Sequence, residues 1–314
     1  MAGEVWLLTD AATDVHAAPG HPERPARREA VAAGVRDGAG DRLVEVPCVA
    51  ADDAEIAAVH DPSLMSTLQA ADARGGGWLD PETYVAAGSW QAARLAAGAT
   101  LQAARGVAAG EAEVAFAAVR PPGHHASARR ASGFCLLNNV AIAAAGLRAD
   151  GLARRVAIVD WDVHHGDGTQ SIFDADPDLC YASTHQWPLF PGTGHAVERG
   201  SDGAAGTKHN HPLDPGSGDD AFTAAWLGAL LPAVEAFEPD AILVSAGYDA
   251  HRADPLAHLE VTEAGFGAVA RALGEASRRL GLPGVALTFE GGYDLDALRG
   301  SAAATVTGLL AGRA

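Results

Sequence analysis

Short apolar runs recur along the chain and are separated by longer, alanine-rich stretches. The short runs are typical of buried strands, and they cover 5–8, 43–46, 114–119, 156–162, 180–184, 241–247 and 285–291. The longer stretches are typical of helices, and they cover 23–36, 52–59, 63–72, 87–108, 138–148, 219–236, 262–280 and 296–311. This alternation predicts an α/β fold in which a parallel sheet is covered by helices on both faces.

The chain shows no internal repeat and no long polar linker. Its 314 residues, 48% of them hydrophobic, are enough to build one large core. We therefore expect a single domain over residues 1–314, with the glycine-rich segments 74–80 and 198–207 as loops inside it.

The net charge of −18 changes the range of expected partners. An acidic surface repels phosphates, so we expect no direct nucleic-acid partner. The cysteines Cys48, Cys135 and Cys180 do not have the spacing of a zinc finger or of a disulfide framework. Reduced thiols of this kind fit a cytoplasmic protein.

The beginning of the chain, MAGEVWLLTD, lacks a basic segment ahead of a long apolar run. We interpret it as a first strand and not as a signal peptide. No apolar stretch approaches the roughly 20 residues that a membrane-spanning helix needs, so we expect no membrane association.

Polar segments follow four of the predicted strands. They are RPPGHHA (120–126), DWDVHHGDG (160–168), GYDAHRADP (247–255) and EGGYD (290–294). Ligands of open parallel sheets bind beyond the carboxyl ends of the strands. The sequence therefore predicts a functional site at this edge.

Asp162 and His164 stand two residues apart at a strand end, so their side chains share one face with Asp160. Such an Asp-x-His pair can chelate a divalent cation, although by itself it favours a polar cluster satisfied by loop amides. Asp249 follows a second apolar strand, and Tyr293 follows a glycine pair. Individually these side chains fit a solvated acid and a core tyrosine, but their joint placement favours a site.

These segments, taken together, resemble the histone deacetylase superfamily, which also contains acetylpolyamine amidohydrolases and acetoin-utilisation proteins. The matching stretches occur in the family's order and are HPERPARR (21–28), RPPGHHA (120–126), GFCLLNNVAIAA (133–144), DWDVHHGDGTQ (160–170), FPGTG (190–194), SAGYDAHRADPL (245–256) and EGGYD (290–294). Two of them, RPPGHHA and WDVHHGDGTQ, favour the class II-like and bacterial amidohydrolase branch. The resemblance implies an arginase/deacetylase-like sheet of about eight strands.

The resemblance implies a divalent metal held by Asp162, His164 and Asp249. Zn²⁺ is the default ion, and Fe²⁺ is the alternative because two carboxylates and one imidazole form a hard ligand set. The reaction implied is amide hydrolysis, for which Tyr293 would stabilise the oxyanion.

A histidine pair would transfer the protons of this reaction. The resemblance makes His125 the general base and then the general acid, and gives His124 an electrostatic role. Asp160 would orient His124, and Asp167 would orient His125. His165 has no implied role, and we expect it to be a structural hydrogen-bonding residue.

The resemblance also implies a structural K⁺ near Asp160, Asp162 and His164, with Ser183 and Thr184 completing the site. Farther along the chain, its only lysine, Lys208, and the adjacent His209 stand where relatives usually carry aromatic or aliphatic residues. That departure argues against a second monovalent-cation site.

The resemblance assigns the substrate channel to Gly133, Phe134 and Phe190, whose rings would enclose an acyl-lysine side chain; both phenylalanines also fit an ordinary core. The Gly133 carbonyl would accept the substrate N–H. Arg27 would lie deep in the pocket near the released acid, or it is only a cation on a helix face. Leu256 occupies an entrance position where a carboxylate favours polyamines.

The leucine favours acyl-lysine over acetylpolyamines, whereas the overall negative charge favours a cationic substrate. Two further departures from the family pattern are Arg129 and Arg130 near the rim, and Tyr248, whose extra hydroxyl needs a partner. A homo-oligomer is also open, since an entrance loop such as 72–90 is placed to pack across a dimer.

Three alternatives remain to the lysine deacylase. One is an acetylpolyamine amidohydrolase that uses the same chemistry. Another is a catalytically silent protein that binds an acylated ligand, which the intact ligand set and Tyr293 disfavour. The third is an arginase-like binuclear hydrolase, which would need a second set of metal-bridging acids and histidines that the sequence lacks.

Overall fold

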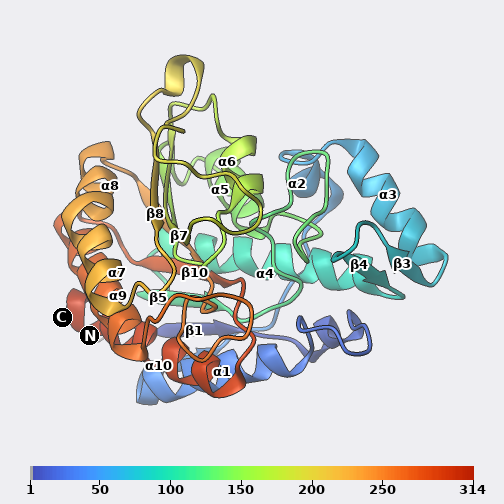
Figure 1. Cartoon of the computed structure of the whole chain (residues 1–314), viewed down its shortest axis with the longest axis horizontal. Helices are drawn as coiled ribbons and strands as arrows, with labels where there is room; N and C mark the ends of the chain where they lie inside the picture. Colours follow the sequence, from blue (N-terminus) through green and yellow to red (C-terminus); the bar gives the residue numbers. More distant parts are fainter. Residues whose placement is uncertain (1–2) are drawn as a thin grey trace.

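A parallel sheet of eight strands forms the centre of the computed structural model, which describes residues 3–314 (Figure 1). The strand order is β2-β1-β5-β10-β9-β6-β7-β8, and every neighbouring pair is parallel. The strands are β1 (Val5–Leu8), β2 (Leu43–Glu45), β5 (Val114–Ala117), β6 (Val156–Asp160), β7 (Leu179–Gln186), β8 (Lys208–Leu213), β9 (Ala241–Ala246) and β10 (Val285–Phe289). The predicted fold class is confirmed.

Helices cover both faces of this sheet. One face packs against α1 (Ala26–Ala39), α7 (Asp219–Ala225), α8 (Leu231–Phe237), α9 (Glu263–Arg279) and α10 (Leu295–Arg313). The other face packs against α4 (Ser89–Ala108) and α5 (Asn139–Ala149). Outside these layers α2 (Asp53–Ala57) and α3 (Pro62–Ala73) form a smaller cluster against α4 and α5. No helix within residues 3–314 is long and apolar enough to cross a membrane.

Strand residues alternate between the two cores, as a sheet buried on both sides requires. In β6, Ala157 and Val159 face the core beneath α9 and α10, whereas Ile158 faces the core beneath α4 and α5. This two-sided burial explains why the strands read as continuous apolar runs and not as alternating patterns.

One strand of the sheet was not predicted. The edge strand β8 has the sequence KHNHPL, which lacks an apolar run, and three of its six residues are only partly buried. A second difference lies in the predicted loop 74–80, where β3 (Gly76–Trp78) pairs with β4 (Tyr84–Ala86) in an antiparallel hairpin. Three consecutive glycines from Gly75 adopt positive φ and hide the strand signal.

The predicted helix over 219–236 is continuous but changes its winding. A π-helical turn over Trp226–Leu230 joins α7 to α8. Pro232 follows at the beginning of α8 and has no backbone N–H to bond a carbonyl of the preceding turn. The local shift to wider hydrogen bonding accommodates that missing donor. A short helix that was not predicted, α6 (Asp167–Ile172), follows the DWDVHHGDG segment.

The strand order explains how distant motifs meet. The four strands that precede the polar segments, β5, β10, β9 and β6, are consecutive neighbours in the sheet. Because all four are parallel, their carboxyl ends lie at one edge, and the segments that follow them converge there.

Candidate active site

Asp162, His164 and Asp249 meet beyond the ends of β6 and β9. Their ligand atoms all lie within 4.8 Å of one another. His164 Nδ1 is 3.2 Å from Asp162 Oδ1 and 3.1 Å from Asp249 Oδ2. Both carboxylates are buried, and His164 is partly exposed.

Main-chain amides fix the orientation of both carboxylates. The Gly291 N–H donates to Asp162 Oδ2 at 2.7 Å, and the Val163 N–H donates to Asp249 Oδ1 at 2.8 Å. The remaining oxygen of each acid therefore faces His164. A Cβ on Gly291 would stand 2.0 Å from Asp249 Oδ2, which explains the need for glycine in the EGGYD segment.

The three side chains fit a divalent cation. Ligands about 2.1 Å from a tetrahedral ion stand about 3.4 Å from one another, close to the spacing seen here. Among residues 3–314, neither Asp162 nor Asp249 forms an ion pair with a lysine or arginine. Burial alone lowers the pKa of His164, but the two carboxylates more than offset it and raise this pKa to about 10. Such concentrated negative charge favours a bound cation.

Two histidine–carboxylate pairs lie beside this cluster. His124 Nδ1 is 3.1 Å from Asp160 Oδ2, and His125 Nδ1 is 2.7 Å from Asp167 Oδ1. These are the two pairs that the family resemblance implies. The RPPGHHA loop is held by the Asn139 side chain, which donates to the Pro121 carbonyl at 3.0 Å.

The two histidines have opposite electrostatic environments. Burial lowers the pKa of His124, but the carboxylates of Asp162 and Asp160 raise it well above its ordinary value. Burial and the charge of His124 lower the pKa of His125 to about 4 despite its contact with Asp167. The ring centroids are 4.0 Å apart, so one proton on the pair opposes a second. His125 is thereby kept neutral and able to accept a proton.

The predicted potassium residues lie at the junction of β6 and β7. Asp160 and Ser183 are register partners, and both are buried. The Thr184 hydroxyl accepts from the Trp226 indole N–H at 3.0 Å. Thr184 would therefore contribute to a potassium site through its main-chain carbonyl. Tyr181, which was not predicted, donates its hydroxyl to Asp160 at 3.0 Å.

Tyr293 lines the cavity beside the Asp162–His164–Asp249 group. Its N–H donates to Asp254 at 2.7 Å, while its ring packs against Phe134 at 5.9 Å between centroids. The hydroxyl has no hydrogen-bond partner among residues 3–314. Burial, followed by the charges of Asp249 and Asp162, keeps the pKa of Tyr293 well above its ordinary value, so it remains a hydrogen-bond donor.

A cavity of about 390 Å³ opens above these groups. Its wall includes the predicted channel residues Gly133, Phe134, Phe190 and Leu256. Phe190 packs on His125 with ring centroids 5.1 Å apart. Gly133 has φ +54°, and a Cβ there would meet the His125 ring at 2.5 Å. Glycine therefore leaves room for the His125 ring beside the cavity.

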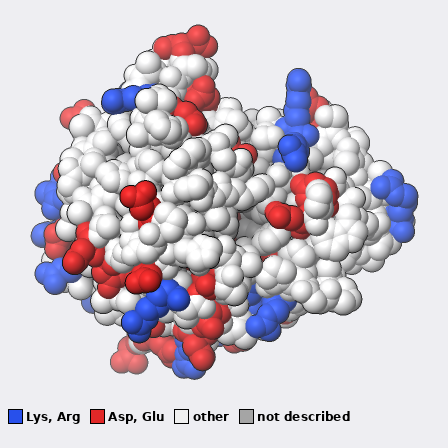
Figure 2. Space-filling model, viewed as in Figure 1, with Lys and Arg blue, Asp and Glu red and all other residues white. Residues whose placement is uncertain are grey.

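The mouth of the cavity includes residues that were not predicted. Trp78 on the β3–β4 hairpin lines it and is 61% exposed. His21 packs between Tyr84 and Phe134, while Glu82 adds a carboxylate to the wall. In the sequence, Trp78 is an isolated tryptophan in the glycine-rich segment 74–80 and Glu82 belongs to the Pro-Glu-Thr turn that follows it, and neither pattern indicates a binding wall. On the face drawn in Figure 2, acidic and basic side chains surround a broad uncharged area.

Arg27 is the predicted pocket residue that the cavity wall does not include. Its guanidinium lies behind Tyr293, 4.6 Å from the ring centroid, and is fully buried. It donates to Glu23 and to the main-chain carbonyls of Glu290 and Gly292. Arg27 thus lies on α1 behind the cavity and braces the turn that carries Tyr293, and its predicted contact with a released acid stays a prediction.

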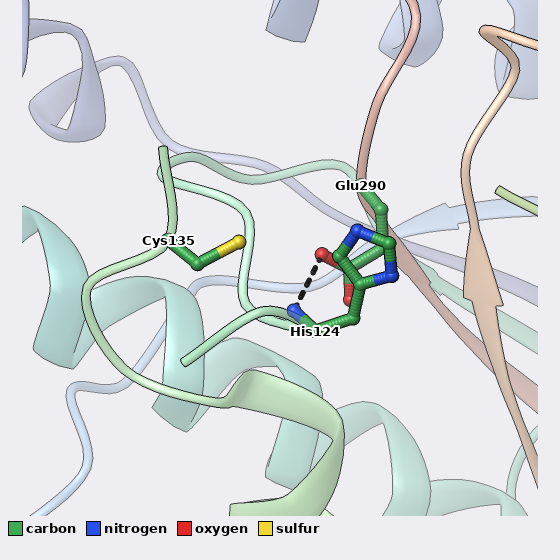
Figure 3. A group of neighbouring side chains, drawn as sticks. All are labelled: His124, Cys135 and Glu290. Atoms are coloured by element: carbon green, nitrogen blue, oxygen red, sulfur yellow. Dashed lines mark hydrogen bonds between the residues drawn. The ribbon is translucent and has the colours of Figure 1, made fainter. Parts of the chain in front are cut away.

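Glu290 belongs to a second group of potential ligands, together with His124 and Cys135 (Figure 3). The Glu290 carboxylate accepts from the main-chain N–H of Gly123 at 2.6 Å and of His124 at 3.2 Å. The Ser245 hydroxyl donates to its other oxygen at 3.0 Å. These contacts make Glu290 a support for the loop that carries His124 and His125. In the sequence, the signal for such a role was an acidic residue directly after an apolar strand.

Deeper support comes from Glu23, which is fully buried between Arg27 and Arg120. Burial raises the pKa of Glu23, but the two guanidinium groups reverse this effect and bring it to about 2.

Two other expectations concern the hydrogen-bond partners of His165 and Tyr248. His165 bonds Thr193 at 2.8 Å and Gln170 at 3.0 Å, and the Tyr248 hydroxyl bonds Thr305 at 3.2 Å.

The structure also places the two predicted rim residues. Arg130 lines a shallow depression beside the cavity mouth, and Arg129 pairs with Asp61 at 3.1 Å. The three cysteines are unpaired. Residues 1–2 of the predicted domain lie outside the described residues.

The comparisons with known proteins agree with this geometry. Residues 21–309 match the histone deacetylase domain family. The probable deacetylase of Methanothermobacter thermautotrophicus is 42% identical over 94% of this chain and 88% of its own length. The histone deacetylase-like amidohydrolase of Pseudomonas aeruginosa is 37% identical over 88% of this chain and 73% of its own length.

A plant relative and a solved structure extend the comparison. Histone deacetylase 15 of Arabidopsis thaliana is 39% identical over 97% of this chain, which spans 55% of that relative's length. The crystal structure of the HDA15 HD domain superposes with a TM-score of 0.92 at 37% identity, covering 99% of this chain and 89% of that one. The chain therefore belongs to the histone deacetylase family.

Proposed function

We propose that this protein is a metal-dependent deacylase that removes acetyl or other acyl groups from N-acyl-lysine or related acylated amines. The observation that carries the proposal is one cavity beside which three functional parts meet. Asp162, His164 and Asp249 supply a divalent-cation site, His125 supplies a neutral base, and Tyr293 supplies a free hydroxyl. Amide hydrolysis requires these parts together.

Zn²⁺ is the ion we propose for the Asp162–His164–Asp249 group, with Fe²⁺ as the alternative, because the donor set is one imidazole and two carboxylates. When bound, it would supply positive charge that polarises an amide carbonyl and makes water more acidic. We also propose a structural K⁺ beside Asp160 and Ser183, which the burial of both side chains supports.

The chain's own residues would carry the protons. His125, neutral in its buried setting, accepts a proton from the attacking water and then delivers it to the leaving amine. Asp167 holds the His125 ring in one orientation through its 2.7 Å contact. His124, held by Asp160, adds positive charge next to the reacting centre.

Substrate binding uses the walls of the cavity. Phe134 and Phe190 exclude water along an extended alkyl chain, and the Gly133 carbonyl accepts the substrate N–H. Tyr293 donates its hydroxyl to the oxygen that becomes negative, and its high pKa keeps that proton available. Arg27 acts on the reaction through the position of Tyr293.

Acyl-lysine is the substrate that we favour. Leu256 on the cavity wall offers no carboxylate to a cationic polyamine. One observation favours the acetylpolyamine alternative: Glu82 places an acid at the mouth. The alternative of a catalytically silent binding protein has no comparable support.

We also propose a cytoplasmic location, which is supported by the unpaired cysteines. We further propose a homo-oligomer formed through the β3–β4 hairpin, which carries the exposed Trp78.

A single set of assays tests the proposal. Metal-replete protein is compared on an acetyl-lysine peptide and acetylspermidine, with and without a hydroxamate or a chelator. We expect higher kcat/KM on the peptide and loss of both activities on chelation. Higher kcat/KM on acetylspermidine would favour the polyamine alternative. Failure to hydrolyse any acyl amide across a range of chain lengths would leave binding as the function.

A further inference from the structure

Lys208 is an unusual residue in this chain. It is the only lysine in the sequence, and it is fully buried at the beginning of the edge strand β8. Lysine side chains are almost never fully buried unless they are paired with an acid. Among residues 3–314, no carboxylate oxygen lies within 4.0 Å of its ammonium nitrogen.

Neutral oxygens surround this ammonium group instead. Lys208 Nζ donates to the Leu179 carbonyl at 2.8 Å, to the Asp176 carbonyl at 3.3 Å and to the Thr207 hydroxyl at 2.7 Å. The Thr207 hydroxyl donates its own proton to the Ala204 carbonyl, so its oxygen is free to accept. All three ammonium protons are thereby used.

These three oxygen atoms are of the kind that bind monovalent cations in proteins. Main-chain carbonyl oxygens replace the hydration shell of K⁺ where proteins select that ion. An ammonium group is a compact point charge of comparable chemistry, whereas a guanidinium is a planar fork. Burial lowers the pKa of Lys208 to about 8, which leaves the amine mostly protonated at neutral pH. The oxygens therefore surround a single positive charge.

The Lys208 ammonium joins two neighbouring segments of the sheet. The Asp176 carbonyl belongs to the turn before β7, Leu179 is the first residue of β7, and Lys208 is the first residue of the neighbouring strand β8. The Tyr181 N–H also bonds the Thr207 carbonyl at 3.0 Å. The ammonium thus fastens the edge strand to the turn before β7, the strand that carries Ser183.

The geometry points to a monovalent-cation cradle formed by the carbonyls of Asp176 and Leu179 and the hydroxyl of Thr207, in which the ammonium of Lys208 replaces a free ion. The wild-type protein binds no K⁺ there. A variant without the lysine side chain accepts K⁺ or Rb⁺ at that point. The inference is independent of the proposed catalysis, because none of these residues lines the active-site cavity.

The test compares Lys208→Ala, which opens the cradle, with Lys208→Met, whose side chain keeps it filled without a charge. Melting temperatures are measured in KCl and in choline chloride at equal ionic strength. We expect K⁺ to raise the Tm of Lys208→Ala by about 2–4 °C more than it raises that of Lys208→Met or of the wild type. A K⁺ effect at the proposed Asp160–Ser183 site is common to all three proteins and cancels in this comparison.

Rubidium locates the ion directly. Crystals of Lys208→Ala grown with RbCl should show an anomalous peak among the three oxygens, and wild-type crystals should show none at that point. Equal K⁺ responses of the alanine and methionine variants, or a rubidium peak beside Lys208 in the wild type, would overturn the inference.

A further variant decides the matter if Lys208→Ala does not fold in either salt. Thr207→Val keeps the lysine and removes one acceptor. We expect it to lower the Tm equally in KCl and in choline chloride, since the ammonium still fills the site. An unchanged Tm would show that the ammonium does not depend on these oxygens, and the inference would then fail.

Discussion

The Tyr293→Phe variant tests the role of the Tyr293 hydroxyl in catalysis, because it should leave the fold unchanged. The Tyr293 side chain is 9% exposed and is fixed by the Arg27 guanidinium 4.6 Å from its ring. Its backbone N–H is fixed separately, by Asp254. Neither contact uses the hydroxyl, so its removal should change the free energy of unfolding by less than about 1 kcal/mol.

The effect on catalysis should be much larger. Loss of one oxyanion donor in a dry site lowers kcat by about 10²–10³, or roughly 2.7–4 kcal/mol of transition-state stabilisation. The measurement is kcat and KM for acetate release from an acetyl-lysine peptide, with metal content and Tm determined on the same samples. We expect kcat to fall while KM, metal content and Tm stay close to the wild-type values.

Tyr248→Phe is the matched control. Its hydroxyl bonds Thr305 at 3.2 Å inside the core and faces away from the reaction. Loss of that bond should lower stability by roughly 0.5–1.5 kcal/mol and leave kcat unchanged. A Tyr293→Phe enzyme whose kcat stays within about threefold of the wild type would refute the assignment of Tyr293 to the oxyanion.

Three further predictions concern orientation, selectivity and stability. Asp167→Asn removes the charged partner of His125 at 2.7 Å and should lower kcat by about 10–100-fold with little change in Tm; unchanged kcat would argue against the orienting role. Leu256→Glu should shift the ratio of kcat/KM towards acetylspermidine over acetyl-lysine peptide by about tenfold, measured with both substrates in one preparation. Arg120→Met leaves the buried Glu23 with one guanidinium partner and should cost about 3–5 kcal/mol in urea unfolding. Because the pKa of Glu23 falls from 4.5 to about 2 on folding, wild-type stability from this group is complete above pH 4.5 and is lost as the pH falls towards 2; Arg120→Met should weaken that acid dependence.

The sequence predicted the site better than its surroundings, for a physical reason. Parallel strands bring their carboxyl ends to one edge, so acids and histidines that follow apolar runs could be grouped before any contact was known. Asp162, His164 and Asp249 meet on this principle, and His125 joins them from a third segment.

The residues that support the site could not be predicted in the same way. Arg27, Glu23 and Arg120 form their network through side chains far apart in the sequence, and no local pattern reveals which partners share a buried charge. Trp78 reached the cavity mouth only because three glycines allow a hairpin to bend there.

The strand β8, at one edge of the sheet, escaped prediction for a different reason. Burial on both faces produces the apolar runs from which central strands are recognised. The strand β8 pairs on one edge only, and it contains a lysine, an asparagine and two histidines. Its strand character depends on pairing with β7, which a hydrophobicity pattern does not contain.

Metal binding and deacylation should depend on the same three side chains, which is tested by measuring the metal content of wild-type protein and of Asp249→Ala and assaying deacylation on the same samples. We predict about one divalent ion per wild-type chain, and joint loss of the ion and of activity in the variant. Full activity in wild-type protein that holds less than about a tenth of an equivalent of metal, or in an Asp249→Ala variant, would contradict it.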